Sequence, residues 1–218
     1  MVRVFWIKSC QTGFFALILL ILISCMGTSS QIAIESDGSG SIILEYIISD
    51  QLENLGGLDG NHNRLPIPAG RIDFERSVAR VPGLALVSYS SRQNGNDIIH
   101  RAELAFASPD ALTAFLDSSG RYFQFDFPGR KLVISFYQTR TIDTTFREFT
   151  ADILKEYYFS ISFSVPGTAN AQWLDGDGRI INHFPGDCIV LGRAVRYTVS
   201  MTELVFLESP LYLEISWE

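Results

Sequence analysis

The feature that most constrains the fold is a strict alternation of apolar and polar residues. In "YFSISFSV" the apolar set that includes Phe163 would lie on one face of a strand and three serines on the other. Alternation of this kind is typical of antiparallel sheets that bury one face and expose the other to water. Five segments show it: residues 122–127, 131–138, 158–165, 195–201 and 211–217. Between the first two, "PGR" predicts a hairpin turn that contains Gly129.

Three segments have helical spacing instead. Residues 68–83, "PAGRIDFERSVARVPG", place apolar residues on one helical face and end at Pro-Gly. Residues 108–116, "SPDALTAFL", begin with Ser108 as the predicted N-cap and with proline at the first helical position. Residues 141–157 carry an amphipathic stripe that includes Phe146 and Phe149.

The order of these elements predicts an α+β fold, a mostly antiparallel sheet with helices on one face. Residues 41–127 follow the β-α-β-β-α-β order of split, ferredoxin-like units, and the part from Ala171 onward reads as a C-terminal β-hairpin extension. We predict one domain over residues 32–218. Its long turn-rich loop, residues 56–70, has a length that is often functional.

The N-terminal segment predicts secretion. Arg3 and Lys8 precede an uncharged apolar run over residues 13–23, whereas a bilayer-spanning helix needs about 20 apolar residues. A basic start, a short apolar run and a small residue at its end describe a secretory signal peptide, which we assign to residues 1–24.

The end of that segment, Leu22-Ile23-Ser24-Cys25, resembles the lipobox of bacterial lipoproteins. By this resemblance the Cys25 thiol receives a diacylglyceryl group, the chain is cut after Ser24, and the new amino terminus is acylated, for example with palmitate. Two or three acyl chains hold a protein on a membrane almost permanently. Cys25 is therefore the predicted lipid anchor, on the extracytoplasmic side of the cell envelope, followed by a short linker over residues 25–31. The alternative is an uncleaved anchor with an incidental cysteine.

Charge excludes some partners. The chain has a net charge of −7, and removal of Arg3 and Lys8 with the signal peptide makes the mature value −9. Such an acidic chain is not expected to bind nucleic acid, which requires basic patches. Attachment to anionic headgroups is equally disfavoured, so the predicted membrane contact is through the acyl chains. Cys188 is left as the only unmodified cysteine, and we predict a buried small apolar residue in preference to a nucleophile.

The glycine- and aspartate-rich motifs read as turns. "DGDGR" at 175–179 lacks the glycine and glutamate that an EF-hand calcium loop needs at its sixth and twelfth positions. "SDGSGS" at 36–41 precedes a strand, whereas phosphate binding of this type requires a helix. We therefore predict no metal and no cofactor.

The histidines do not form a helical metal pair, since none of the three is spaced at i+3 or i+4 from another. His100 falls on the apolar face of its strand, where we predict a structural histidine bonded to backbone; a ligand or base is the alternative. No nucleophile elbow, HExxH pair or Walker loop is present. We predict a protein that is not an enzyme, with a hydrolase using His100 or the 56–70 loop as a less favoured alternative.

Three stretches together resemble bacterial envelope lipoproteins of the LppM type: "DGSGSIILEYIIS" at 37–49, "VPGTANAQWLDGDGRIINHF" at 165–184 and "VRYTVSM" at 195–201, with the Cys25 lipobox before them. The resemblance implies a membrane-tethered α/β domain that associates with envelope lipids or glycolipids. The chain departs from the LppM pattern in lacking a C-terminal membrane helix. No catalytic residue is carried over.

Two hypotheses of function follow. The first is a non-enzymatic lipoprotein that binds an envelope lipid or glycolipid or supports envelope assembly, with the inner face of the sheet and the helix carrying Phe146 and Phe149 as walls of the lipid site. The second is an interaction scaffold or adhesin-like module with a protein partner. An apolar cavity would favour the first, and a solid core with an exposed apolar patch would favour the second.

Overall fold

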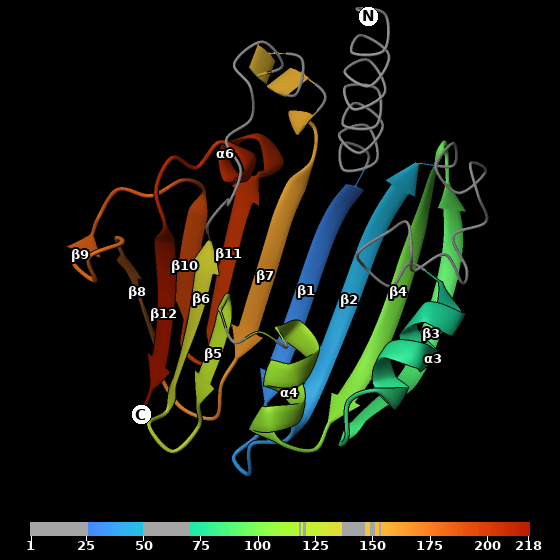
Figure 1. Ribbon diagram of the computed structural model, residues 1–218, viewed down its shortest axis with the longest axis horizontal. Coiled ribbons are helices and arrows are strands. Elements are labelled where there is room, and N and C mark those ends of the chain that lie inside the picture. The colour runs from blue at the N-terminus through green and yellow to red at the C-terminus, as the bar shows by residue number, and fades with distance from the viewer. Residues whose placement is uncertain are drawn as a thin grey trace, which may run out of the picture.

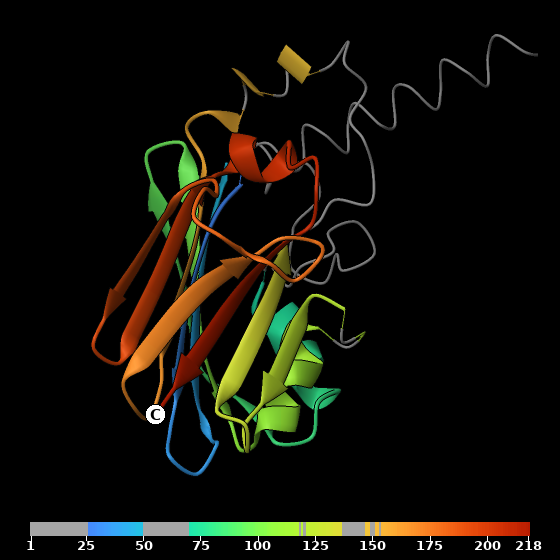
Figure 2. The same cartoon turned by 90° about the vertical axis from the view of Figure 1, so that its left-hand side faces the viewer.

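Two β-sheets pack face to face, and two helices cover the part of the larger sheet that the smaller one leaves uncovered (Figures 1 and 2). The computed structural model describes residues 26–49, 70–117, 119, 121–136, 147–148, 151–152 and 154–218. The α+β prediction is confirmed.

The larger sheet, sheet A, has seven strands in the order β10-β11-β7-β1-β2-β4-β3. Its strands in chain order are β1 (Met26–Ile34), β2 (Gly40–Ser49), β3 (Leu84–Asn94), β4 (Asp97–Phe106), β7 (Tyr158–Ser164), β10 (Asp187–Leu191) and β11 (Ala194–Ser200). All neighbours pair antiparallel except β1 and β7, which run parallel.

The smaller sheet, sheet B, has five strands in the order β5-β6-β12-β8-β9, all antiparallel. They are β5 (Phe123–Asp126), β6 (Lys131–Phe136), β8 (Ala169–Leu174), β9 (Ile180–Ile181) and β12 (Leu211–Trp217). The predicted hairpin is β5–β6, and its turn places Arg130 at a φ of 53°.

Helices α3 (Arg71–Ala79) and α4 (Pro109–Leu116) confirm the first two helix predictions, and α6 (Met201–Val205) was not predicted. Ser108 caps α4 as expected, because its Oγ accepts a hydrogen bond of 3.2 Å from the Ala111 N–H. Phe74 of α3 is fully buried against the rings of Tyr46 and Tyr89 on sheet A. Both longer helices therefore lie on one face of sheet A, as predicted (Figure 2).

The ferredoxin-like order holds only in part. Strands β2, β4 and β3 are neighbours in that order, but β5, the expected fourth strand, pairs with β6 in sheet B. The place beside β2 is taken by β1, because the two are joined by the tight turn after Ile34, in which Gly38 has a φ of 85°. The part from Ala171 onward, predicted as one β-hairpin extension, instead contributes strands to both sheets.

The segment predicted as a linker is instead the first part of a strand. β1 begins at Met26, directly after Cys25, and pairs with β2 from Met26↔Ile48 onward. From Thr28 it pairs with β7 on its other side. The backbone hydrogen bonds to two neighbours hold this polar stretch in the sheet, although its side chains have little apolar character.

The core lies between the two sheets. Phe163 and Val195 from sheet A meet Leu132, Leu213 and Ile215 from sheet B within one buried cluster. The inward set predicted for 158–165 is confirmed, since Phe163 is 1% exposed and Val165 is fully buried.

Candidate functional site

The main candidate site is a groove on the outer face of sheet A, the face turned away from sheet B. We call it the outer groove. It has a volume of about 290 Å³ and is partly open to solvent. The outward side chains that line it are Gln31, Ala33, Ser41, Ile43, Ser162, Ser164, Ile189, Leu191, Ala194 and Arg196.

Strand register explains why the sheet is hollow here. One row of neighbouring residues crosses the sheet from β10 to β2: Leu191, Ala194, Ser164, Ala33 and Ser41. The next row, in the same strands, is Ile189, Arg196, Ser162, Gln31 and Ile43. In the first row alanine and serine side chains form the floor of the groove. In the second row Arg196 and Gln31 lie on either side of Ser162, and Ile189 and Ile43 stand at the two ends.

The walls are apolar and one of them is strongly exposed. Ile43 of β2 stands on one side, and Ile189 and Leu191 of β10 stand on the other, with exposed fractions of 49% and 73%. The residues that alternate with the outward side chains of the groove, Phe163 and Val195, point inward and are almost fully buried. The strands that carry the groove are therefore fixed to the core.

Among the described residues that line the groove, one has a charged side chain. Arg196 lies between Ile189 and Ser162 in its row, and its side chain forms no ion pair or hydrogen bond with any residue that the structure describes. A guanidinium in this position can pair with a carboxylate or a phosphate. The groove thus has apolar side walls and one cationic side chain, Arg196, next to the wall formed by β10.

The inner face of sheet A, predicted as one wall of a lipid cavity, is packed. Tyr197 lies with its ring centroid 5.3 Å from that of Phe136 and 4.7 Å from that of Trp173, and Trp173 stacks on Phe184 at 4.6 Å. Sheet B supplies these aromatic partners, which the assignment of all strands to one sheet did not anticipate. The inner face is core, and Phe146 and Phe149 lie outside the described residues.

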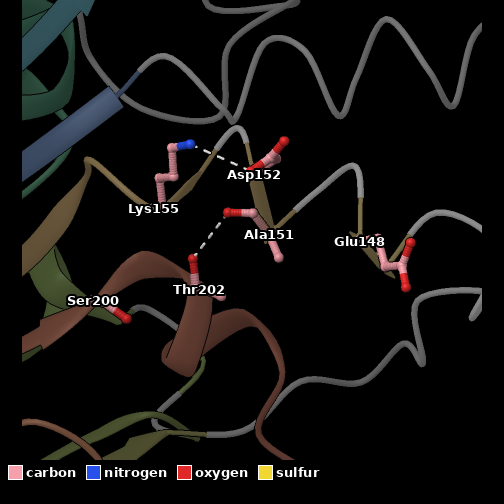
Figure 3. A pocket seen from close by; sticks show the side chains of 6 residues that line it. All are labelled: Glu148, Ala151, Asp152, Lys155, Ser200 and Thr202. Carbon is pink, nitrogen blue, oxygen red and sulfur yellow. Dashed lines mark hydrogen bonds and ion pairs between the residues drawn. The ribbon is translucent and has the colours of Figure 1, made fainter.

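A second hollow, of about 680 Å³, lies beside the start of α6 (Figure 3). Its polar groups are engaged with one another: Lys155 Nζ lies 3.3 Å from Asp152 Oδ1, and the Thr202 hydroxyl donates to the Ala151 carbonyl oxygen at 3.4 Å. Ser200 Oγ accepts a hydrogen bond from the Glu203 N–H and so caps α6. The described residues that line this hollow are mostly polar and do not place a nucleophile beside a base, so it is a weaker candidate.

His100 is buried as predicted, at 3% exposure, but its ring bonds to a side chain. Its Nδ1 lies 2.7 Å from the Tyr89 hydroxyl oxygen, beneath α3. Nearby Tyr46 is equally enclosed, and burial raises its pKa to about 12. A histidine so enclosed cannot reach a substrate in solvent, so His100 is a structural residue of the core.

Of the other predicted features, the structure describes Cys188 and the turn at 175–179 but not Cys25 or most of the 56–70 loop. Cys25 and the 56–70 loop fall among the residues not described, apart from Gly70. Cys188 is half-buried, and burial raises the pKa of its thiol. The turn at 175–179 is confirmed, with Asp175 accepting from the Asp177 and Arg179 N–H groups.

Two further kinds of site are absent from the described residues. Among them no group of three or more histidine, cysteine or carboxylate side chains is arranged to hold a metal ion. Within the same residues, no helix is long and apolar enough to cross a membrane.

Comparison with known proteins leaves the family open. No protein-family model matches the chain, and no curated protein sequence matches it. The NMR structure of the folded domain of the Mycobacterium tuberculosis LppM protein is a structural neighbour, with 9% identity and a TM-score of 0.43 over 88% of this chain and 90% of that one. A similarity of this size does not establish a family, and the LppM-like resemblance of the sequence remains a prediction.

Proposed function

We propose that this protein is a non-enzymatic lipoprotein of the bacterial cell envelope, anchored through Cys25, that binds the acyl chain of an anionic amphiphile in the outer groove. The observation that carries the proposal is the groove itself: a floor of small side chains, apolar walls from β2 and β10, and Arg196 at one side. Its volume is at the lower limit of ligand pockets, which start at about 300 Å³. A single acyl chain is thus a better match than a whole diacyl lipid.

Burial of the acyl chain supplies most of the affinity. Each buried methylene group contributes about 0.8 kcal/mol, whereas an ion pair at an exposed arginine contributes about 0.2–1 kcal/mol. The groove is therefore expected to select for an apolar chain first and for an acidic headgroup second.

The rest of the molecular surface does not favour general attraction to membranes. The mature charge of −9 repels anionic headgroups, so membrane association rests on the acyl chains of Cys25. Anchor and groove then have separate roles: the anchor fixes the protein on the extracytoplasmic side of the membrane, and the groove holds the ligand.

A protein partner is the second candidate, and one observation favours it. β10 is an edge strand of sheet A whose residues Ile189, Val190 and Leu191 are all strongly exposed, without proline, lysine or a bulge to prevent pairing with another chain. The other edge of sheet A, β3, is mostly polar and has a bulge between Leu86 and Ser88. An added strand would extend sheet A beyond β10 and place its outward side chains beside Ile189 and Leu191, the wall of the groove on that side.

Filling the groove tests the proposal. Ala194→Phe places a large ring on the floor, while Ala85→Phe makes the same change on the same exposed face of sheet A, at β3 and outside the groove. We expect Ala194→Phe to weaken binding of fluorescent lysophosphatidylglycerol at least tenfold in a titration of residues 26–218, which include every described residue. Ala85→Phe should change it less than twofold. Equal effects of both variants would place the ligand elsewhere, and no binding by the unmodified protein would favour the protein partner.

Arg196→Gln tests the headgroup preference. We expect about threefold weaker binding of lysophosphatidylglycerol and unchanged binding of a neutral monoacylglycerol, because only the first probe carries an anion. Arg92→Gln, on the same face but outside the groove, is the matched control. An equal loss of affinity for both probes would show that Arg196 does not distinguish an anionic headgroup from a neutral one.

A further inference from the structure

The start of β1 restricts where the domain can sit on its membrane. β1 is already paired with β2 at Met26, and Met26 is the residue that follows Cys25. If Cys25 carries the acyl chains, no spacer separates the lipid from the folded sheet. One residue spans at most about 3.6 Å, so the first residue of β1 must lie at the headgroups.

We infer that the end of sheet A at which β1 begins rests on the phospholipid surface that holds Cys25, with Tyr158 and α6 in contact with the headgroups. We call it the Met26 end. The inference rests on the proposed lipidation of Cys25 and adds an orientation and a contact surface to it. The occupant is the bilayer itself, because the anchor leaves no spacer between Cys25 and the first residue of β1.

The side chains at the Met26 end suit an interface. Tyr158 is the first residue of β7, next to the start of β1 in the sheet, and it is 55% exposed. Its partner in β11 is Ser200, after which α6 begins, and Figure 1 shows α6 and the start of β1 at the same end of the sheet. Tyrosine is enriched at membrane surfaces because its ring is apolar and its hydroxyl is polar.

α6 and the two residues after it carry two kinds of apolar residue. Leu204 and Leu207 pack against the core and hold the helix on the sheet. Met201 and Val205 are partly exposed and do not belong to the buried cluster, whereas the ring of Phe206 is covered by the guanidinium of Arg147, 4.8 Å from its centroid. Met201 and Val205 are therefore the apolar side chains of α6 that are available to a lipid surface.

Charge does not create this contact. Glu203 of α6 is exposed, and the carboxylates of Glu148 and Asp152 lie near the same helix, where Lys155 pairs with Asp152 (Figure 3). An acidic rim is repelled by anionic lipid, so the neutral residues and the anchor must maintain the contact.

The orientation also places the outer groove. At about 3.3 Å per residue, Gln31 and Ala33 lie roughly 17 and 23 Å along β1 from Met26. The groove then stands clear of the headgroups when the sheet is upright, and its ligand enters from the aqueous side and not from the membrane beneath. The turn after β1 is farther still, since it follows Ile34, which is roughly 26 Å from Met26 along the strand.

Fluorescence quenching by lipid can measure this orientation in the full lipidated protein. In a Cys188→Ala background, a fluorophore is attached at Tyr158→Cys or at Ser36→Cys, both exposed, at opposite ends of the sheet. The protein is placed in phosphatidylcholine vesicles that contain a nitroxide-headgroup phospholipid. We expect quenching at least threefold stronger at position 158 than at position 36.

Two results would overturn the inference in different ways. Equal quenching at both positions, with Cys25 acylated by intact mass, would mean that the domain lies on its side or stands off the surface, and the anchor would remain valid. Absence of acyl groups on Cys25 would overturn the anchoring and the orientation together.

Discussion

Cys25→Ser is expected to leave an uncleaved precursor without acyl chains. A serine hydroxyl does not replace the thiol that accepts the diacylglyceryl group, and cleavage after Ser24 depends on that modification in the lipoprotein pathway that the lipobox resembles. Loss of the acyl chains removes a membrane attachment that is otherwise almost permanent. Intact mass and partition into detergent measure both effects.

Cys10→Ser is the matched control, because Cys10 lies within the same predicted signal peptide but not at the cleavage site. It should mature normally. If Cys25→Ser instead matures to the mass of the unmodified protein and enters the detergent phase, the anchor assignment is wrong.

Phe163→Ala is expected to lower the free energy of unfolding by about 3–5 kcal/mol, a large part of the stability of a domain of this size. The side chain is 1% exposed and lies in the inward row that includes Val195 and Ile32. Truncation leaves a cavity directly behind the floor of the outer groove, so ligand affinity should fall as well. Denaturant titration measures the first effect.

Ser164→Ala is the control for that change, since the neighbouring residue points outward into the groove and its truncation should alter stability by no more than about 0.5 kcal/mol. An unchanged melting temperature for Phe163→Ala would show that the inward row is not the core.

Local signals account for the parts of the fold that the sequence predicts. The alternation in residues 122–127 and 131–138 and the turn between them act over a few residues, and the β5–β6 hairpin forms as expected. The same is true of α4, whose serine cap and first-turn proline lie next to each other in the chain. The period of apolar residues along a helix or strand predicts which of its faces is buried. It does not depend on which element packs against that face.

The partner strands are what periodicity cannot report. β1 pairs in parallel with β7, so Thr28 lies beside Phe159, a residue far away in the sequence. The polar stretch at the start of β1 has no apolar alternation because hydrogen bonds on both sides, and not side-chain burial, hold it in place. Its assignment as a linker followed from reading side chains alone.

The outer groove was missed for the same reason. Each small outward residue is visible in the sequence, as in the serines of "YFSISFSV", but such residues are also what any solvated face would carry. Only the strand order aligns Ala194, Ser164 and Ala33 in one row. His100 shows the converse: its burial followed from its face of the strand, whereas its bond to Tyr89 depended on the pairing of β3 with β4.

Native mass spectrometry of the protein purified from its own membranes tests the central claim most directly. The account predicts a protein whose mass includes the acyl groups on Cys25 and, in addition, a non-covalently bound anionic lipid that is lost in Ala194→Phe and kept in Ala85→Phe. An acylated protein that carries no additional lipid, or one that keeps its lipid in Ala194→Phe, would contradict the assignment of the outer groove as the binding site.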